Sequence, residues 1–252
     1  MIQLTAAIIT FNEEKNIARC IESLLPVADE ILIVDSFSKD KTKEISLSYP
    51  NVRFVENPFE GHIQQKNVAL KMANHPWVLS LDADEALTEE LQQSILAIKS
   101  NPLHKGFSLN RLTYYCGHWV KYCGWYPDTK TRLVLREAAE WRGVNPHDRL
   151  DLIDNSTIGQ LKGDLLHYSY YTAEQHYKQI EYFGDIAAKE LYDKGKSTNY
   201  LVIYGKTAAQ FIKSFFIKKG FLDGQTGWLI SKRSAYATYR KYSKLLDLNK
   251  KK

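Results

Sequence analysis

The amino-acid sequence predicts an α/β fold in which a mostly parallel sheet is flanked by helices and followed by a basic, helical C-terminal region. Three observations lead to this prediction. Within residues 1–100, short apolar runs rich in Ile, Leu and Val alternate with helical patterns. Strand patterns without that alternation occupy residues 106–170, and the sequence after Thr172 is helical in character. We therefore expect one domain over residues 1–171 and a helical region over 172–252.

Four strands are expected in the first 100 residues, and their continuous apolar character is typical of parallel strands covered by helices on both faces. They are LTAAIITF (4–11), EILIVDS (30–36), VRFVEN (52–57) and WVLSLDAD (77–84). Three helices are expected between them: one along the apolar stripe Ile17, Ile21, Leu24 and Leu25 after Asn12 as N-cap, one after Asp40 as cap, and one over 63–72. This alternation favours a mostly parallel sheet, because parallel neighbours need crossover connections.

The second half of the chain changes character. Residues 106–120 and 130–136 read as strands, and 156–170 contains another. Beyond Thr172 the helical pattern is interrupted near Gly195 and at GFLDGQTG (220–227), because glycine disfavours helix interiors.

The composition is that of a globular protein: 252 residues, 44% hydrophobic and 25% charged. The start, MIQLTAAIITFNEE, lacks a basic segment and a cleavage site, and no apolar run is long enough to span a membrane. Three cysteines, Cys20, Cys116 and Cys123, are too few for a disulfide framework. We therefore expect a cytoplasmic protein in a reducing compartment.

The positive charge is concentrated at the C-terminus. From Lys206 to Lys252 there are 12 Lys or Arg and two acidic residues, so the net charge of this segment is +10. Since the whole chain has a net charge of +5, the first 205 residues have a net charge of −5. Such a segment is expected to face a polyanion: membrane phosphates, nucleic acid or an anionic glycan. In KTAAQFIKSFFIKKG, Phe and Ile alternate with Lys, which suits either a packed helix or a helix on an anionic membrane surface.

Residues 77–87, WVLSLDADEAL, end an apolar strand in three acids. In an extended chain Asp82 and Asp84 project to the same face, and two close carboxylates resist joint ionisation unless a cation lies between them. Mg²⁺ and Mn²⁺ prefer such oxygen ligands. The alternative is a strand end leading into the first turn of a helix, where acids suit the helix dipole.

Polar residues end the other expected strands as well, namely Thr10 and Asn12 after the first strand and Asp35 and Ser36 after the second. In open α/β sheets, ligands bind beyond the carboxyl ends of the strands. These strand ends are therefore the expected binding site.

The segments ITFNEEKNI, ILIVDSFSKDKT, GHIQQKNVAL and VLSLDADE, in this order, resemble the nucleotide-sugar half of family 2 glycosyltransferases with the GT-A fold, a Rossmann-type sheet. The later segments NRLTYYCG, GWYPDTKTRLVLR and GFLDGQTG resemble a narrower group, the lipopolysaccharide-core glucosyltransferases that add β-glucose to an inner-core heptose. The resemblance implies a nucleotide-sugar half over 1–100 and an acceptor half over 101–171. It also implies a UDP-sugar donor, specifically UDP-glucose, and a heptose of lipooligosaccharide core as the acceptor. The protein would then act at the inner face of the cytoplasmic membrane and would have no nucleic-acid partner.

The resemblance also assigns roles to residues of the donor site. Thr10, Asn12 and Glu13 would form the loop that holds the uridine, and Asp35 would contact the base or the ribose. Lys66 and Asn67 would face the nucleotide, and Asp82 would lie on the ribose side. Asp84 and His167 would hold the divalent cation, Mg²⁺ or Mn²⁺. The second strand departs from the family pattern, because Ser36 stands where a second acid is common.

An inverting transfer needs a base within hydrogen-bond reach of the acceptor hydroxyl. Two acids lie in suitable segments, Asp128 in GWYPDTKTRL and Asp148 in NPHDRL. The resemblance favours Asp148, since related sequences place an acid directly after this histidine.

Three other functions remain open from the sequence. A nucleotidyltransferase would share the sheet and the acids, but it normally has a glycine-rich basic loop after the first strand, which TFNEEKN lacks. A non-catalytic nucleotide- or glycan-binding module would keep the uridine loop without needing a base. Binding of nucleic acid through the basic segment is the third.

Overall fold

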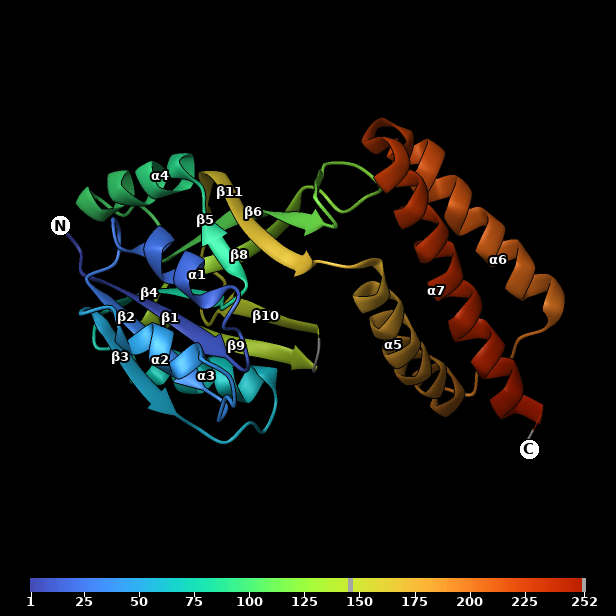
Figure 1. The fold of residues 1–252 in the computed structure, drawn as a ribbon, viewed down its shortest axis with the longest axis horizontal. Helices are drawn as coiled ribbons and strands as arrows, with labels where there is room; N and C mark the ends of the chain where they lie inside the picture. Colours follow the sequence, from blue (N-terminus) through green and yellow to red (C-terminus); the bar gives the residue numbers. More distant parts are fainter. Residues whose placement is uncertain (145–146, 251–252) are drawn as a thin grey trace. The chain divides into compact units, whose positions relative to one another are not determined.

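The computed structural model describes residues 1–144 and 147–250 and divides into two compact units (Figure 1). Unit 1 combines Met1–Arg111 with Asp128–Tyr168, and unit 2 combines Leu112–Pro127 with Ser169–Lys252. The division of function at residue 171 stays a prediction, since these units are bodies of dense packing and do not by themselves define functional domains.

The α/β class is confirmed, with a large mixed sheet in the order β3-β2-β1-β4-β8-β6-β11-β5. Its strands are β1 (Leu4–Thr10), β2 (Glu30–Asp35), β3 (Val52–Glu56), β4 (Trp77–Asp82), β5 (Glu85–Leu87), β6 (Gly106–Tyr115), β8 (Asp128–Leu135) and β11 (Gly159–Tyr170). The strands β3, β2, β1 and β4 pair in parallel, as predicted, and the pairings of β8 with β4 and β6 and of β11 with β5 are antiparallel. A short strand, β7 (His118–Val120), pairs with the end of β6 in unit 2.

The parallel register aligns the predicted strand ends. Thr10 pairs with Asp35 across β1 and β2, and Ile9 pairs with Asp82 across β1 and β4. The polar residues that follow these strands therefore share one edge of the sheet.

Among the described residues of unit 1 there are four α-helices: α1 (Ile17–Leu24), α2 (Thr42–Leu47), α3 (His62–Met72) and α4 (Glu89–Ser100). Asn12 was the expected cap of the first helix, but that helix begins at Ile17 after Asn16. The physical reason is local: Asn12 has a left-handed backbone (φ 55°), and its side chain accepts a hydrogen bond from the Lys39 backbone N–H at 2.8 Å. Asn12 therefore joins two loops and does not cap a helix.

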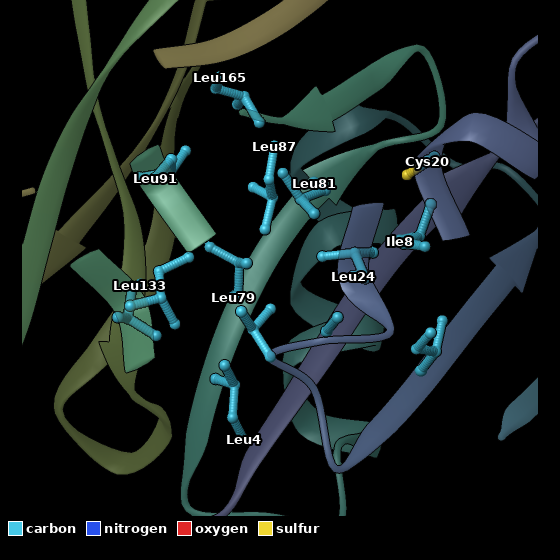
Figure 2. Packing of buried hydrophobic residues seen from close by; sticks show 14 of the residues in the cluster. Leu4, Ile8, Cys20, Leu24, Leu79, Leu81, Leu87, Leu91, Leu133 and Leu165 are labelled. Atoms are coloured by element: carbon cyan, nitrogen blue, oxygen red, sulfur yellow. The ribbon is translucent and has the colours of Figure 1, made fainter. Parts of the chain in front are cut away.

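Burial of apolar side chains on both faces of the sheet holds unit 1 together. On one face, Ile17, Ile21 and Leu24 of α1 are fully buried against side chains of β1, β2 and β4. Figure 2 shows Leu24 of this cluster together with Ile8 of β1 and Leu81 of β4. On the other face, α3 packs beside the two-stranded ribbon of β9 (Ala139–Val144) and β10 (His147–Leu152). Each fully buried Leu or Ile contributes roughly 1.5–3 kcal/mol relative to an exposed one.

The second unit consists mainly of helices: α5 (Ala173–Asp193), α6 (Tyr200–Ile212) and α7 (Gly224–Lys250), with α7 packed against both of the others. Thr172 and Gln175 form a capping box at the start of α5, and the chain breaks at Gly195 (φ 70°) as expected. A π-helical turn, η2 (Lys213–Ile217), and a 3-10 turn, η3 (Gly220–Asp223), connect α6 to α7. Within the described residues, no helix is long and apolar enough to cross a membrane.

Candidate active site

A cavity of about 650 Å³ lies at the carboxyl ends of β1 and β4 in unit 1. Eight of the residues singled out in the sequence line it: Thr10, Glu13, Ser36, Lys66, Asp82, Asp84, Asp148 and His167. They come from four loops or strand ends, from α3 and from the β9–β10 ribbon, so the fold gathers residues up to 157 positions apart in the chain.

Lys66 is the central cation of the cavity. Its side chain is buried (4% exposed), and its Nζ lies 3.1 Å from Asp82 Oδ1 and 2.8 Å from Asp148 Oδ2. The same ammonium lies 4.5 Å from the centre of the Trp141 ring. A buried ammonium is costly unless it is paired, and two carboxylates here offset that cost.

Asp82 is held in its charged form. Burial alone raises the pKa of Asp82, but the charges of Lys66 and Arg132 outweigh burial, and the pKa lies well below its usual range. Glu85 stabilises this arrangement: it accepts a hydrogen bond from the Asp82 backbone N–H at 3.0 Å and forms an ion pair with Arg132 at 3.0 Å. Glu85 is 1% exposed and does not line the cavity, so its role is structural.

Asp84 and His167 contact each other in the cavity wall. His167 Nε2 lies 3.2 Å from Asp84 Oδ2, because β11 pairs with β5 and aligns His167 with Glu85. The Tyr168 backbone N–H also donates to the Asp84 carbonyl at 2.9 Å. The structure therefore brings together the two residues expected to hold a cation.

The donor set at this edge fits a divalent cation that shares its ligands with a substrate. Within the part of the chain that the structure describes, no three His, Cys, Asp or Glu side chains form a complete metal cluster. Asp84 and His167 would thus supply two ligands, and phosphate oxygens of a substrate would supply others, as is common for Mg²⁺. The surplus of negative charge is consistent with such an ion, since the described residues that line the cavity include four carboxyl groups and one ammonium.

Glu13 and Thr10 lie at the end of β1. Burial raises the pKa of Glu13 to about 7, a hydrogen bond from Asn16 (2.7 Å) opposes that shift, and the charge of Asp84 adds to it. The Thr10 hydroxyl is buried and has no hydrogen-bond partner among the described residues. A polar ligand in the cavity would satisfy this hydroxyl.

Two predicted donor-site residues lie beside the cavity without lining it. Asn12 is exposed and bridges to the 38–39 loop, and Asp35 accepts hydrogen bonds from the backbone N–H and hydroxyl of Ser38 at 2.7 and 2.5 Å. These residues shape the loop around the site. Ser36, which stands where the family pattern often has an acid, does line the cavity.

Asp128 is separated from the cavity by its own ion pairs. It pairs with Arg111 at 2.7 Å and Lys130 at 3.0 Å, and it is absent from the cavity lining. Burial raises the pKa of Asp128, but the charges of Arg111 and Lys130 outweigh burial and lower it overall. The geometry therefore favours Asp148 over Asp128 as the acid that meets a ligand.

Several residues of the site were missed by the sequence reasoning. Phe59 and His62 line the cavity with ring centres 5.1 Å apart, and Trp141 and Arg132 pack around Lys66 and Asp82. His62 could have been found, because it lies four positions before Lys66 on α3 and so shares its face. Arg132 also left a signal, since a charged residue within an apolar strand pattern is usually paired.

Asn67, expected to face the nucleotide, instead fixes the ribbon. Its side chain donates to the Trp141 carbonyl at 2.9 Å and accepts from the Trp141 N–H at 3.0 Å. Asn67 therefore ties α3 to β9 and indirectly places the strand opposite it, which carries Asp148.

Comparison with known proteins agrees with this geometry. The family model described as Glycosyl transferase family 2 matches residues 5–132. A protein of Rickettsia prowazekii (strain Madrid E) named as an uncharacterized glycosyltransferase is 30% identical over 262 residues, covering 100% of this chain and 89% of its own length. The lipopolysaccharide core biosynthesis glycosyltransferase LpsC of Rhizobium meliloti (strain 1021) is 26% identical, covering 96% of this chain and 94% of its own.

Among solved structures, the crystal structure of S. aureus TarS residues 1–349 in complex with UDP-GlcNAc matches with a TM-score of 0.51 and 15% identity. The match covers 98% of this chain and 90% of that chain, and it shows a shared fold. The matched family model and the relative that spans the whole chain lead to one conclusion: the chain belongs to glycosyl transferase family 2.

Proposed function

We propose that this glycosyltransferase transfers a sugar, specifically glucose, from a UDP-sugar to a hydroxyl of a heptose in lipopolysaccharide core, with inversion at the sugar carbon. The observation that carries the proposal is the cavity in which the ammonium of Lys66 contacts both Asp82 and Asp148. The same cavity is lined by the contacting pair Asp84 and His167. The name of the LpsC relative supports the acceptor class. The UDP-GlcNAc complex of the TarS fold neighbour is in keeping with a UDP-sugar donor.

The donor end of the reaction would use the residues at the strand ends. The Thr10 hydroxyl and Ser36 line the cavity and offer hydrogen bonds to a nucleoside, and Lys66 offers a positive charge to a diphosphate. Asp84 and His167 would hold a divalent cation, which when bound offsets the charge that develops on the leaving diphosphate. No acid is then needed to protonate the leaving group.

The acceptor end would use Asp148 as the base. As the acceptor oxygen bonds to the sugar carbon and the bond to the diphosphate breaks, the hydroxyl proton passes to the Asp148 carboxylate and UDP leaves. The ion pair with Lys66 fixes the direction of that carboxylate in the free protein. A single displacement of this kind inverts the configuration at the reacting carbon.

The acceptor would be presented at the inner face of the cytoplasmic membrane, because lipopolysaccharide core is anchored to lipid. The basic segment from Lys206 to Lys252, with a net charge of +10, suits an anionic membrane surface.

The proposal is tested by a donor screen. Purified protein is incubated with a panel of nucleotide sugars, Mg²⁺ or Mn²⁺ and a heptose-containing acceptor, and release of UDP and the glycosylated product are measured. We expect acceptor-dependent turnover of UDP-glucose. The proposal fails if no donor is hydrolysed or transferred and Asp84→Ala behaves as the wild type. Donor binding without any transfer would favour the non-catalytic module.

A further inference from the structure

Residues 212–228, from the end of α6 to the first turns of α7, expose six large apolar side chains. We call this group the aromatic tip; its members are between 48% and 68% exposed, and they are Ile212, Phe216, Ile217, Phe221, Leu222 and Trp228. Three exposed lysines are interleaved with them, namely Lys213, Lys218 and Lys219. In the sequence from Lys206 to Leu246 the one acid is Asp223, which is 7% exposed, so the charge presented at this surface is positive.

The aromatic tip stands on a tightly packed support. A Cβ on Gly227 would lie 1.8 Å from the Gly220 carbonyl oxygen, and one on Gly220 would lie 2.8 Å from Cys123 Sγ. The GFLDGQTG segment thus lets two turns of backbone approach more closely than any larger residue permits. The exposed side chains are therefore presented from a fixed surface.

Asp223 ties the same support to residues 118–122. Its carboxylate accepts hydrogen bonds from the Tyr122 backbone N–H at 2.9 Å and contacts His118 Nε2 at 3.1 Å. Within the π-helical turn, Ser214 is buried and bonded to Ser231 at 3.0 Å, while Phe216 and Ile217 point to solvent. Such turns often occur at functional sites, because they change which side chains share a face.

Exposed aromatic and aliphatic groups with interleaved lysines match the chemistry of a bilayer interface. Apolar side chains insert at the boundary between headgroups and acyl chains, and each nearby Lys adds attraction to anionic headgroups. We propose that the aromatic tip is a docking surface for a bilayer containing anionic phospholipid. This inference extends the proposed function, which needs a lipid-anchored acceptor, but lipid binding itself requires neither donor nor acceptor.

The test is co-sedimentation of the full chain with vesicles of phosphatidylcholine alone or mixed with phosphatidylglycerol. Two variants probe the tip: Phe216→Ser/Ile217→Ser/Phe221→Ser removes apolar groups, and Lys213→Gln/Lys218→Gln/Lys219→Gln removes charge. A matched control, Leu47→Ser/Leu103→Ser/Ile153→Ser, removes three apolar side chains that are 52–80% exposed in unit 1.

We expect the wild type to bind only vesicles that contain phosphatidylglycerol. Each tip variant should bind these vesicles at least about tenfold more weakly, since one Lys near such a surface raises the binding constant roughly fivefold. The control should bind like the wild type, and circular dichroism should show equal melting temperatures for all four proteins. Absence of binding to the anionic vesicles, or tip variants that bind like the wild type, overturns the proposal.

Two further measurements separate the alternatives. If light scattering shows an oligomer that the tip variants dissociate, and vesicles are not bound, the surface contacts a second copy and the lipid proposal is wrong. UDP release with a water-soluble heptose acceptor tests the reaction separately: failure of that assay with vesicle binding intact rejects only the proposed function. Retained turnover with no vesicle binding rejects only the docking surface.

Discussion

Lys66 joins the two ends of the proposed reaction in a single side chain. Its ammonium contacts Asp82 on the donor side and Asp148 on the acceptor side, and it is almost completely buried. Since the pairing is shared, a change in one carboxylate alters the surroundings of the other. Each substitution in this group must therefore be judged by both folding and rate.

The role of Asp148 is tested at this scale. Asp148→Asn keeps the shape and one acceptor oxygen for Lys66 but cannot take a proton, so kcat for transfer is expected to fall about 10²–10⁴-fold. The matched control is Asp128→Asn, which lies in ion pairs outside the cavity and should leave the rate within an order of magnitude. Steady-state kinetics with circular dichroism of each variant checks the result. Equal losses in both variants would contradict the assignment of Asp148.

A site residue could be predicted from the sequence when local structure fixes its position, and not when contacts distant in the sequence fix it. Asp82 and Asp84 were predictable because parallel strands carry their following residues to one edge of the sheet. The location of Asp128 was not, because its partner Arg111 lies on a neighbouring antiparallel strand whose register no local pattern reveals. The loop role of Asn12 depends likewise on contacts 27 positions away.

Elements differ in the same way. The strands β1, β2 and β4 and the helix α1 were predicted from apolar periodicity, because each buries a continuous apolar run or stripe. The strand β3 and the helices α2 and α3 were predicted from their place in the alternation, since β3 is only partly buried and α2 and α3 bury polar residues as well. The strand β5 and the β9–β10 ribbon were missed. β5 has only three residues between acids and a helix cap, and the ribbon is stabilised by cross-strand pairs and by Asn67 from α3.

One glycine shows how closely α4 packs against β11. A Cβ on Gly163 (φ 85°) would lie 2.3 Å from the Leu91 backbone nitrogen. Gly163→Ala should therefore lower the free energy of unfolding by about 3 kcal/mol or more, from backbone strain plus the clash. Gly117→Ala is the control, because its φ is 93° and nothing lies within 4 Å, so strain alone should cost about 1 kcal/mol. Denaturant unfolding measures both, and equal losses would rule out the clash.

The start of α5 gives a pH prediction. His176 is buried beside Tyr115, and burial, with a smaller contribution from the charge of Arg233, lowers the pKa of His176 to about 4. Above pH 6.5 both folded and unfolded states carry the neutral ring; as pH falls from 6.5 toward 4, only the unfolded state takes up the proton, and stability is lost.

We expect His176 to account for about 1–3 kcal/mol of lost unfolding free energy across this pH range. His176→Gln should flatten that part of the profile while lowering stability at neutral pH, since it removes ring packing. Urea unfolding at a series of pH values checks this, with His62→Gln as the control for an exposed imidazole. A wild-type profile that stays flat from pH 6.5 to 4 would show the prediction to be wrong.

At the scale of the whole molecule, the chain separates its charges. The 205 residues that contain the cavity carry −5, and the basic segment carries +10. The chain also passes between its two units at residues 111–112, 127–128 and 168–169, so neither unit is a continuous segment. A diphosphate that binds unit 1 therefore enters a region of net negative charge, and the long-range electrostatic field of that region does not attract it.

This imbalance predicts that the cation and the donor bind together. With two protein ligands, Asp84 and His167, the ion should bind weakly alone, and UDP alone should be repelled by the carboxylates. Each ligand should therefore shift the melting temperature little by itself, whereas UDP with Mn²⁺ should stabilise the protein by about 2.7 kcal/mol at a hundredfold excess over Kd.

EDTA should abolish both this stabilisation and transfer, and added Mn²⁺ or Mg²⁺ should restore them. Asp84→Asn should lose the joint shift, while Asp151→Asn, in a surface pair with Arg149, should keep it. Thermal melts and calorimetry of UDP binding with and without Mn²⁺ measure the coupling directly. A full UDP shift in EDTA would show that Lys66 and its neighbours accommodate the diphosphate without a cation, and the proposed metal dependence would then be wrong.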